Sequence, residues 1–330
     1  MKRTQIMNTN MIRWGMIGCG AVTEVKSGPA YQKVENFILA AVTRRDQALA
    51  QDYADRHNID TVHVDADALI NDPTIDAIYI ATPPDSHKAL ALKVAQAGKI
   101  CCVEKPLAPS YADCQSIVDA FERAQLPLFV AYYRRSLPRF NHIKQLLDDG
   151  EIGEVRHINW HLNKPANPMD LSQQYNWRTD KMIAAGGYFD DLASHGLDLF
   201  AYLLGDFSMA KGVGINQQHL YTALDAVSAC WLHTNGVTGS GSWNFGGHSR
   251  QDKVVIYGSR GEIRFSVFDE SPIEVITEDK QQQIMIENPT NIQLYHIDNM
   301  RKQLLEGKQH PSTGVTAAHT GWVMSQIVAS

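Results

Sequence analysis

The sequence predicts an α/β protein in which a doubly wound parallel sheet comes first and a larger, mostly antiparallel sheet with a few helices follows. Three observations support this prediction. Short apolar strands alternate with helices up to about residue 131. A glycine-containing turn joins the first strand to the first helix. Past residue 150, longer alternating strands follow one another with few helices between them, which is typical of antiparallel sheets.

In the first part of the chain, the expected strands and helices alternate. The strands are expected at 12–17, 37–43, 75–81, 100–104 and 128–131, and the helices after the glycine turn and at 46–57, 86–97 and 111–124. Strands that are separated by helices run parallel in one sheet. We therefore expect one domain over residues 11–131, preceded by a polar tail at 1–10.

The second part, residues 132–330, is expected to form a separate domain. Its strands are expected at 155–163, 226–234, 237–245, 253–257, 262–268, 273–278 and 283–287, and its helices at 188–204, about 292–305 and from about 315. The segment Gly258 to Gly261 predicts a hairpin between two of these strands, and Glu278 to Gln282 predicts a second one.

Size and composition are those of an ordinary globular protein. The chain has 330 residues, which is longer than a domain with a single hydrophobic core usually is. Hydrophobic residues make up 44% of it and charged residues 20%. The net charge is -6 and no run of basic residues is present, so we expect no basic surface that binds nucleic acid. Neither a membrane-spanning stretch nor a signal peptide is recognisable, so we expect no membrane association and a cytoplasmic location.

The five cysteines have neither the spacing of a zinc site nor that of a disulfide framework. We expect them to be buried free thiols. His157 and His161, on the polar side of the strand expected at 155–163, lack a third ligand, so no metal site is predicted. That polar side could line a substrate cleft or could equally face water.

The glycine turn has the features of a dinucleotide-binding loop. Gly18 permits a sharp turn, and Gly20 lets a pyrophosphate approach the backbone, while Thr23 stands where a third glycine is usual. The free N–H groups at the start of the following helix favour an anion. The expected cofactor-binding residues here are Gly18, Cys19, Gly20, Ala21 and Val22. The alternative is an ordinary turn between a strand and a helix.

Two arginines follow the second strand, at the place where NAD-specific sites carry an acidic residue for the ribose hydroxyls. Arg44 and Arg45 can instead hold a 2′-phosphate through charge-assisted hydrogen bonds. NADP(H) is therefore favoured over NAD(H). Asp46 could still bind a ribose, which keeps NAD(H) possible, and the arginines could also be a solvated surface pair.

A lysine stands at the carboxyl end of the fourth of these strands, where open α/β sheets bind their ligands. Pro106 ends the strand, and Glu104 can orient or balance the Lys105 ammonium. Without its surroundings, a single lysine is normally a solvated surface charge.

Together these segments resemble the Gfo/Idh/MocA family, named for glucose-fructose oxidoreductase and inositol dehydrogenase. The resemblance spans nearly the whole chain and lies in Gly18-Cys19-Gly20, Ala81-Thr82-Pro83-Pro84 with His87, Ala97-Gly98-Lys99, Glu104-Lys105-Pro106, and Gly186-Gly187 leading to Asp191 and His195. It implies a Rossmann domain followed by an α/β domain with an open sheet, often used for dimer or tetramer contacts. It also implies a nicotinamide-dependent reaction on a carbohydrate or cyclic polyol.

The resemblance also assigns residues to roles. Lys105 would lie near the nicotinamide and the substrate hydroxyl, and Ala81, Thr82, Pro83, Pro84 and His87 would line the cofactor, with Glu104 beside them. Tyr133 and Arg134 match substrate-facing positions, and Trp177-Arg178 resembles a Trp-Arg pair that could contact a sugar or the cofactor. The arginines at 44 and 45 depart from the aspartate of the NAD-using inositol dehydrogenases.

Asp191 and His195 are expected on one face of the helix at 188–204, four residues apart. Removing hydride from a carbinol carbon requires a base for the hydroxyl proton, and an imidazole has a suitable pKa. Asp191 could orient the ring of His195, and Lys105 could stabilise the developing alkoxide. Either His195 or Lys105 could be the immediate proton donor in the reverse direction, and His195 could instead be a packing residue.

We therefore expect an NAD(P)-dependent dehydrogenase or reductase that acts on CH–OH groups of a sugar, sugar derivative or cyclic polyol and works as a homodimer or homotetramer. Two alternatives stay open. One is a glycosidase-like enzyme that oxidises its substrate transiently, and the other is a cofactor-sensing regulatory protein without catalysis. Retention of Lys105, Asp191 and His195 together argues against the latter.

Overall fold

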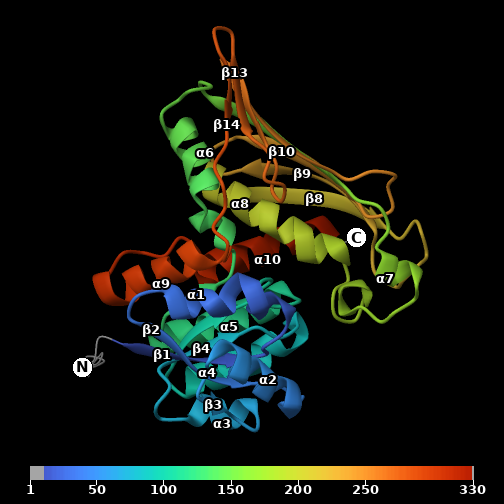
Figure 1. Cartoon of the computed structure of the whole chain (residues 1–330). Coiled ribbons are helices and arrows are strands. Elements are labelled where there is room, and N and C mark those ends of the chain that lie inside the picture. The colour runs from blue at the N-terminus through green and yellow to red at the C-terminus, as the bar shows by residue number, and fades with distance from the viewer. Residues whose placement is uncertain (1–10, 329–330) are drawn as a thin grey trace. The chain divides into compact units, whose positions relative to one another are not determined.

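The computed structural model describes residues 11–328, so the polar tail expected at 1–10 lies outside the described residues. The chain folds into two compact units (Figure 1). Unit 1 contains the chain up to Glu104 and the segments Ser116–Ala131 and Pro289–His310. Unit 2 contains the segments Lys105–Gln115 and Tyr132–Asn288 and the chain from Pro311 onward. The domain boundary expected at residue 131 stays a prediction.

Unit 1 is built on a six-stranded parallel sheet, as the sequence predicts. Its strands, in the order β3-β2-β1-β4-β5-β6, are β3 Thr61–Val62, β2 Phe37–Thr43, β1 Ile12–Ile17, β4 Ala77–Ile80, β5 Ile100–Val103 and β6 Leu128–Val130. This is the strand order of the dinucleotide-binding Rossmann fold. The strand β3 and the helix α3 (Ala66–Asn71) are additions to the expected elements.

The remaining helices of unit 1 accompany these strands. They are η1 Thr23–Ser27, a π-helical turn, followed by α1 Gly28–Lys33, α2 Gln47–His57, the 3-10 turn η2 Pro84–Ser86, α4 His87–Gln96, most of α5 Tyr111–Ala124, and α9 Leu294–Glu306. Helix α9 comes from the far end of the chain and packs against α1. Asn291 ties the two segments together, because its Oδ1 accepts from Lys33 and its Nδ2 donates to the carbonyl of Val25.

Unit 2 is built on an eight-stranded sheet in the order β14-β13-β12-β11-β7-β10-β9-β8. The strands are β7 Val155–Asn163, β8 Phe207–Ile215, β9 Ala226–His233, β10 Thr238–Asn244, β11 Gln251–Gly258, β12 Gly261–Phe265, β13 Ile273–Thr277 and β14 Gln281–Ile284. All neighbours pair antiparallel except β7 and β10, and the two expected hairpins, β11–β12 and β13–β14, are confirmed.

The helical segments of unit 2 are few. They are the 3-10 turn η3 Tyr133–Ser136, α6 Pro138–Asp148, α7 Pro168–Leu171, the 3-10 turn η4 Trp177–Thr179, the π-helical turn η5 Phe189–Ala193, α8 Ser194–Leu204 and α10 Gly314–Val328. The expected helix at 188–204 is therefore a π turn followed by an α-helix. Its first turn is wider than a regular one, so the regular spacing assumed between Asp191 and His195 was wrong.

The two faces of β7 differ in what covers them. Trp160 is fully buried and packs edge-on against Phe200 of α8, with 5.5 Å between ring centroids. Gly196 of α8 allows this approach, because a Cβ there would lie 2.3 Å from the Trp160 ring. On the opposite face, His157 and His161 hydrogen-bond to hydroxyls of β10. Even-numbered side chains of β7 thus point toward α8, and odd-numbered ones point away from it.

Two further expectations can be compared with the described residues. Four cysteines are buried, but Cys230 is exposed on β9, so the expectation that all five are buried was wrong for this one. No helix within residues 11–328 is both long enough and apolar enough to cross a membrane.

Candidate active site

The glycine turn after β1 packs directly against the loop after β4. Gly18 has a φ of 94°, and a Cβ there would lie 2.9 Å from the Ala81 carbonyl oxygen and from Thr82 Cγ2. Only glycine meets both constraints without strain. Two segments that were predicted separately to contact a cofactor, 18–22 and 81–84, are therefore neighbours at the carboxyl end of the unit 1 sheet.

Gly20 differs from Gly18 in what surrounds it. A Cβ at Gly20 would meet no atom of the described residues within 4 Å, so packing of the protein does not require glycine here. Helical structure begins next to it at Ala21 and Val22, while Cys19 is fully buried. A bare backbone facing open space beside a helix N-terminus fits the pyrophosphate of a dinucleotide.

The loop of Ala81, Thr82, Pro83 and Pro84 is held by its own short-range bonds. The buried His87 ring contacts the Thr82 carbonyl through Nε2 at 2.9 Å, and the hydroxyls of Thr82 and Ser86 are 2.6 Å apart. His87 thus stabilises the loop that is expected to line the cofactor.

The residues after β2 are arranged around the glycine turn. Arg44 donates from Nη1 to the Cys19 carbonyl at 2.9 Å, which places its guanidinium beside the turn, and Arg45 is exposed. The Asp46 carboxylate accepts from the Leu49 N–H and caps α2. One oxygen of the Asp46 carboxylate is therefore already engaged in holding the helix.

Glu104 belongs to a buried polar network of unit 1. Its Oε1 accepts from Tyr79 at 2.6 Å and from Gln293 at 2.8 Å, and the Tyr79 hydroxyl also contacts Ser27. Burial and the neighbouring Glu104 raise the pKa of Tyr79 well above its ordinary value. This network fixes the backbone immediately before Lys105, the residue with which unit 2 begins.

In unit 2, Lys105, Asp191 and Arg178 form one ionic cluster. The Lys105 ammonium donates to Asp191 Oδ1 at 2.5 Å and to its carbonyl at 2.9 Å, and Arg178 Nε donates to Oδ2 at 2.8 Å. Side-chain exposure is 12% for Lys105 and 15% for Asp191. The structure thus places a lysine and an arginine on the two oxygens of one sheltered carboxylate.

The electrostatics of this cluster keep Asp191 ionised. Burial alone would raise the pKa of Asp191, but the charges of Lys105 and Arg178 and their hydrogen bonds outweigh it and lower the pKa well below its usual range. The adjacent Asp190 behaves in the opposite way. Burial raises its pKa to about 6 against the hydrogen bond from Gly186 N–H, which its carboxylate accepts at 2.8 Å.

Arg178 is set in place by its own segment. Its guanidinium carbon lies 4.4 Å from the ring centroid of Trp177, a cation–π contact. Asn176 caps η4, and its amide donates to the hydroxyl of Tyr188, which in turn donates to the buried Asp170. Within the Trp-Arg pair expected from the sequence, Arg178 therefore binds Asp191, and the preceding Asn176 connects the segment to Tyr188 and Asp170.

His195 is surrounded by aromatic rings. The centroids of Tyr133 and Phe268 lie 5.5 Å and 5.9 Å from its imidazole, and Tyr132 lies at 6.2 Å. Arg134 stacks on both Tyr133 and Phe268, at 4.9 Å and 4.6 Å, and its Nε donates to the Val267 carbonyl. His195, predicted from the helix at 188–204, and Tyr133 with Arg134, predicted from the family resemblance, thus belong to one cluster.

Three residues around these clusters were not singled out from the sequence. Phe268 borders His195. Asp252, which is 7% exposed, positions Phe268 by accepting from its N–H at 2.6 Å, and it also accepts from Trp160 Nε1 at 2.8 Å. Lys164 directly follows the last residue of β7. For Lys164, the alternation of β7 is a signal that was available in the sequence.

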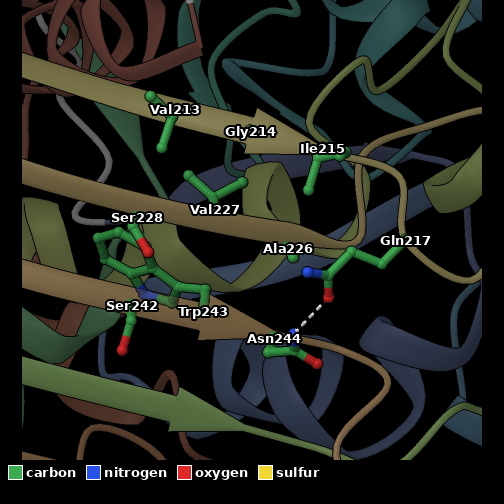
Figure 2. A pocket seen from close by; sticks show the side chains of 10 residues that line it. All are labelled: Val213, Gly214, Ile215, Gln217, Ala226, Val227, Ser228, Ser242, Trp243 and Asn244. Carbon is green, nitrogen blue, oxygen red and sulfur yellow. Dashed lines mark hydrogen bonds between the residues drawn. The ribbon is translucent and has the colours of Figure 1, made fainter.

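Unit 2 also has a hollow of about 510 Å³ on its sheet, lined by residues of β8, β9 and β10 and the turn after β8 (Figure 2). Val213 and Ile215 border it from β8, and Gln217 and Asn244 close one end through a 3.0 Å hydrogen bond. None of the predicted site residues lines this hollow. Among residues 11–328, no cluster of three His, Cys, Asp or Glu side chains could hold a metal ion.

Two family models match the chain. Residues 12–132 match the model described as the oxidoreductase family with an NAD-binding Rossmann fold, and residues 140–264 match the Gfo/Idh/MocA C-terminal domain. The chain belongs to the Gfo/Idh/MocA oxidoreductase family. The fold class and the enzyme class predicted from the sequence, a dehydrogenase or reductase acting on CH–OH groups, are confirmed.

Relatives of this Gfo/Idh/MocA member include sugar and polyol dehydrogenases. It is 37% identical over 314 residues to Oxidoreductase P35 of Formosa agariphila, covering 95% of this chain and 97% of that one. It is 29% identical over 213 residues to levoglucosan dehydrogenase of Pseudarthrobacter phenanthrenivorans, covering 60% and 53%. A solved structure of levoglucosan dehydrogenase with NADH and levoglucosan matches with a TM-score of 0.84 at 23% identity, covering 97% and 96%.

Proposed function

We propose that this oxidoreductase transfers hydride between NADP(H) and a carbinol carbon of a sugar, sugar derivative or cyclic polyol. The observation that carries the proposal is the cluster in which Asp191 is bound by both Lys105 and Arg178. The Asp191 carboxylate, whose pKa is lowered, holds the Lys105 side chain in place. When bound, the nicotinamide supplies or accepts the hydride.

The protein's own residues handle the substrate oxygen and its proton. We assign Lys105 to hydrogen-bond the reacting oxygen and stabilise its developing negative charge. We assign His195 to remove the hydroxyl proton in oxidation and to return it in reduction. We propose that the substrate is surrounded by Tyr133, Arg134, Trp177 and Arg178. A sugar or polyol substrate is supported by relatives of this protein that are named levoglucosan dehydrogenase and myo-inositol 2-dehydrogenase.

A substrate screen tests this function directly. Aldoses, ketoses, cyclic polyols and anhydrosugars would be incubated with NADP⁺ or NAD⁺, and keto-sugars with NADPH or NADH, and nicotinamide absorbance followed. We expect stoichiometric cofactor turnover with at least one class. Release of an aglycone from glycosides without net cofactor turnover would contradict the proposal.

We propose a preference for NADP(H) because Arg44 stands beside the glycine turn with Arg45 next to it, while Asp46 caps α2. Charge-assisted bonds to a 2′-phosphate are worth about 1.5–3 kcal/mol each. Arg44→Ala should therefore weaken NADPH binding about tenfold or more and leave NADH binding within a few fold, measured by fluorescence titration. The exposed Arg123 of α5, changed to Ala, is the control. Equal affinities for NADPH and NADH in the unmodified protein would refute the preference.

We propose that the sheet of unit 2 joins copies of this chain into a dimer or tetramer. Strand β8 lies at the edge of the sheet and exposes Met209, Val213 and Ile215, with Val213 71% exposed. Such an apolar surface beside a hollow is typical of an association site. Val213→Glu should shift the molar mass measured by light scattering toward the monomer, whereas Val64→Glu, at a 74% exposed position of unit 1, should leave it unchanged. A monomeric unmodified protein would contradict this.

A further inference from the structure

Lys164 is the residue from which a substrate class can be inferred. It follows β7 directly, and its backbone is fixed on both sides, because its N–H donates to the Asn244 carbonyl and its carbonyl accepts from the Gly247 N–H. Its side chain is only partly exposed. Lys164 thus stands at the carboxyl end of two parallel strands, β7 and β10, with a fixed backbone and a partly sheltered side chain.

The alternation of β7 indicates the direction of this side chain. Ile158, Trp160 and Leu162 are fully buried on the face that packs against α8. Lys164 continues this even-numbered series one step past the end of the strand. Phe189 of η5 packs on Trp243 at 4.9 Å, and Trp243 pairs with Leu162. The π turn that carries Asp191 therefore lies over the end of β7 from which Lys164 emerges.

The charges around Lys164 are already engaged with other partners. Asp191 and Asp269 are the two carboxylates that favour its charged form, while Arg250 opposes it. Asp191 is bound by Lys105 and Arg178, and Asp269 forms an ion pair with Arg250 at 2.5 Å. Within residues 11–328, Lys164 forms no ion pair and its ammonium no hydrogen bond. Burial, the largest influence, and the nearby Arg250 lower its pKa.

This neighbourhood has an excess of positive charge. Its cations are Lys164, Arg250, and, through their shared partner Asp191, Lys105 and Arg178; its carboxylates are Asp191, Asp269 and Asp190, whose pKa is raised to about 6. The protein as a whole has a net charge of -6, so the excess is local. Sheltering an ammonium from water without an ion-pair partner of its own is unfavourable, and a bound anion reduces that cost.

We propose that the substrate is a sugar acid and that Lys164 binds its carboxylate. This inference rests on the proposed function for the reaction, but the binding of the acid can be measured without turnover. A uronic or aldonic acid carries both a carbinol carbon for oxidation and a carboxylate for Lys164. Lys164 is then a specificity-determining residue that lies apart in sequence from the residues assigned to hydride and proton transfer.

The experiment compares matched acid and neutral sugars on the full-length protein with bound NADPH or NADP⁺. The probes are D-glucuronate with D-glucose and D-galacturonate with D-galactose, measured by calorimetry for binding and by cofactor absorbance for kcat and KM. We expect the acid of at least one pair to bind about tenfold or more tightly than the neutral sugar. Lys164→Met should remove that difference mainly through Kd and KM, and Lys164→Arg should restore part of it.

Lys253→Met is the matched control, because Lys253 is exposed on the neighbouring strand β11 and pairs with His161. Its acid preference should equal that of the unmodified protein. Equal or tighter binding of the neutral sugar in both pairs, or an unchanged acid preference in Lys164→Met, would overturn the inference. Tight acid binding that depends on Lys164 but is accompanied by no cofactor turnover would uphold the inference and contradict the proposed function.

Discussion

Replacing Lys105 with methionine is expected to lower kcat by about 10³-fold while leaving the affinity for NADPH within a few fold. Methionine has nearly the length of lysine but neither charge nor donors, so the reacting oxygen loses its hydrogen bond. Asp191 also loses the partner on Oδ1 and keeps only Arg178 on Oδ2. The loss should therefore appear in kcat rather than in cofactor binding, as steady-state kinetics and fluorescence titration would show.

The same variant should change the acid stability of the protein in a definite direction. The lowered pKa of Asp191 contributes stability that is present above the ordinary carboxyl pKa of about 3.9 and is lost as pH falls toward the lower folded-state value. Without Lys105, that pKa rises, so acid unfolding should begin at a higher pH. Lys105→Arg is the control. It keeps a positive charge beside the Asp191 carboxylate but moves the hydrogen-bond donor away from the position of the Lys105 ammonium. Turnover of Lys105→Met within tenfold of the unmodified protein would contradict the role of Lys105.

The parallel sheet of unit 1 could be predicted because each of its longer strands is a continuous apolar run followed by a helix. β1 and β2 have the expected bounds, and the glycine turn lies between β1 and the first helix. β3 escaped prediction because two residues, Thr61 and Val62, carry no periodicity. β8 escaped because its apolar residues are interrupted by Gly212 and Gly214 and several of them are exposed.

Long-range packing could not be predicted. Nothing in the sequence of α9 indicates that it packs on α1, more than 250 residues earlier, since that contact depends on Asn291 meeting Lys33 and the carbonyl of Val25. The same holds for the candidate site. Lys105 and Asp191 were each recognised, but their pairing with Arg178 requires the π turn η5 and a capped η4, and no residue pattern specified either.

Replacing His195 with asparagine is expected to lower kcat/KM for alcohol oxidation by about 10²–10⁴-fold, the usual contribution of a general base. Asparagine keeps a polar planar group among Tyr133, Phe268 and Tyr132 but cannot take up a proton. Oxidation needs the neutral imidazole, so activity that depends on His195 falls as pH decreases. Reduction needs the imidazolium, so the corresponding activity falls as pH increases.

The effect of Asp190 must be separated from that of His195 in this pH dependence, because a carboxyl with a pKa of about 6 produces an inflection of its own. Its pKa of about 6 means that its carboxylate, which accepts the Gly186 N–H, becomes protonated below that pH and weakens the turn before η5. Asp190→Asn keeps an acceptor for Gly186 but does not titrate. Its pH profile should therefore retain the dependence that proton transfer by His195 produces and lose the inflection of Asp190, while His195→Asn should retain only the inflection of Asp190. If His195→Asn matched the unmodified protein at every pH, proton transfer would have to be assigned to Lys105 instead.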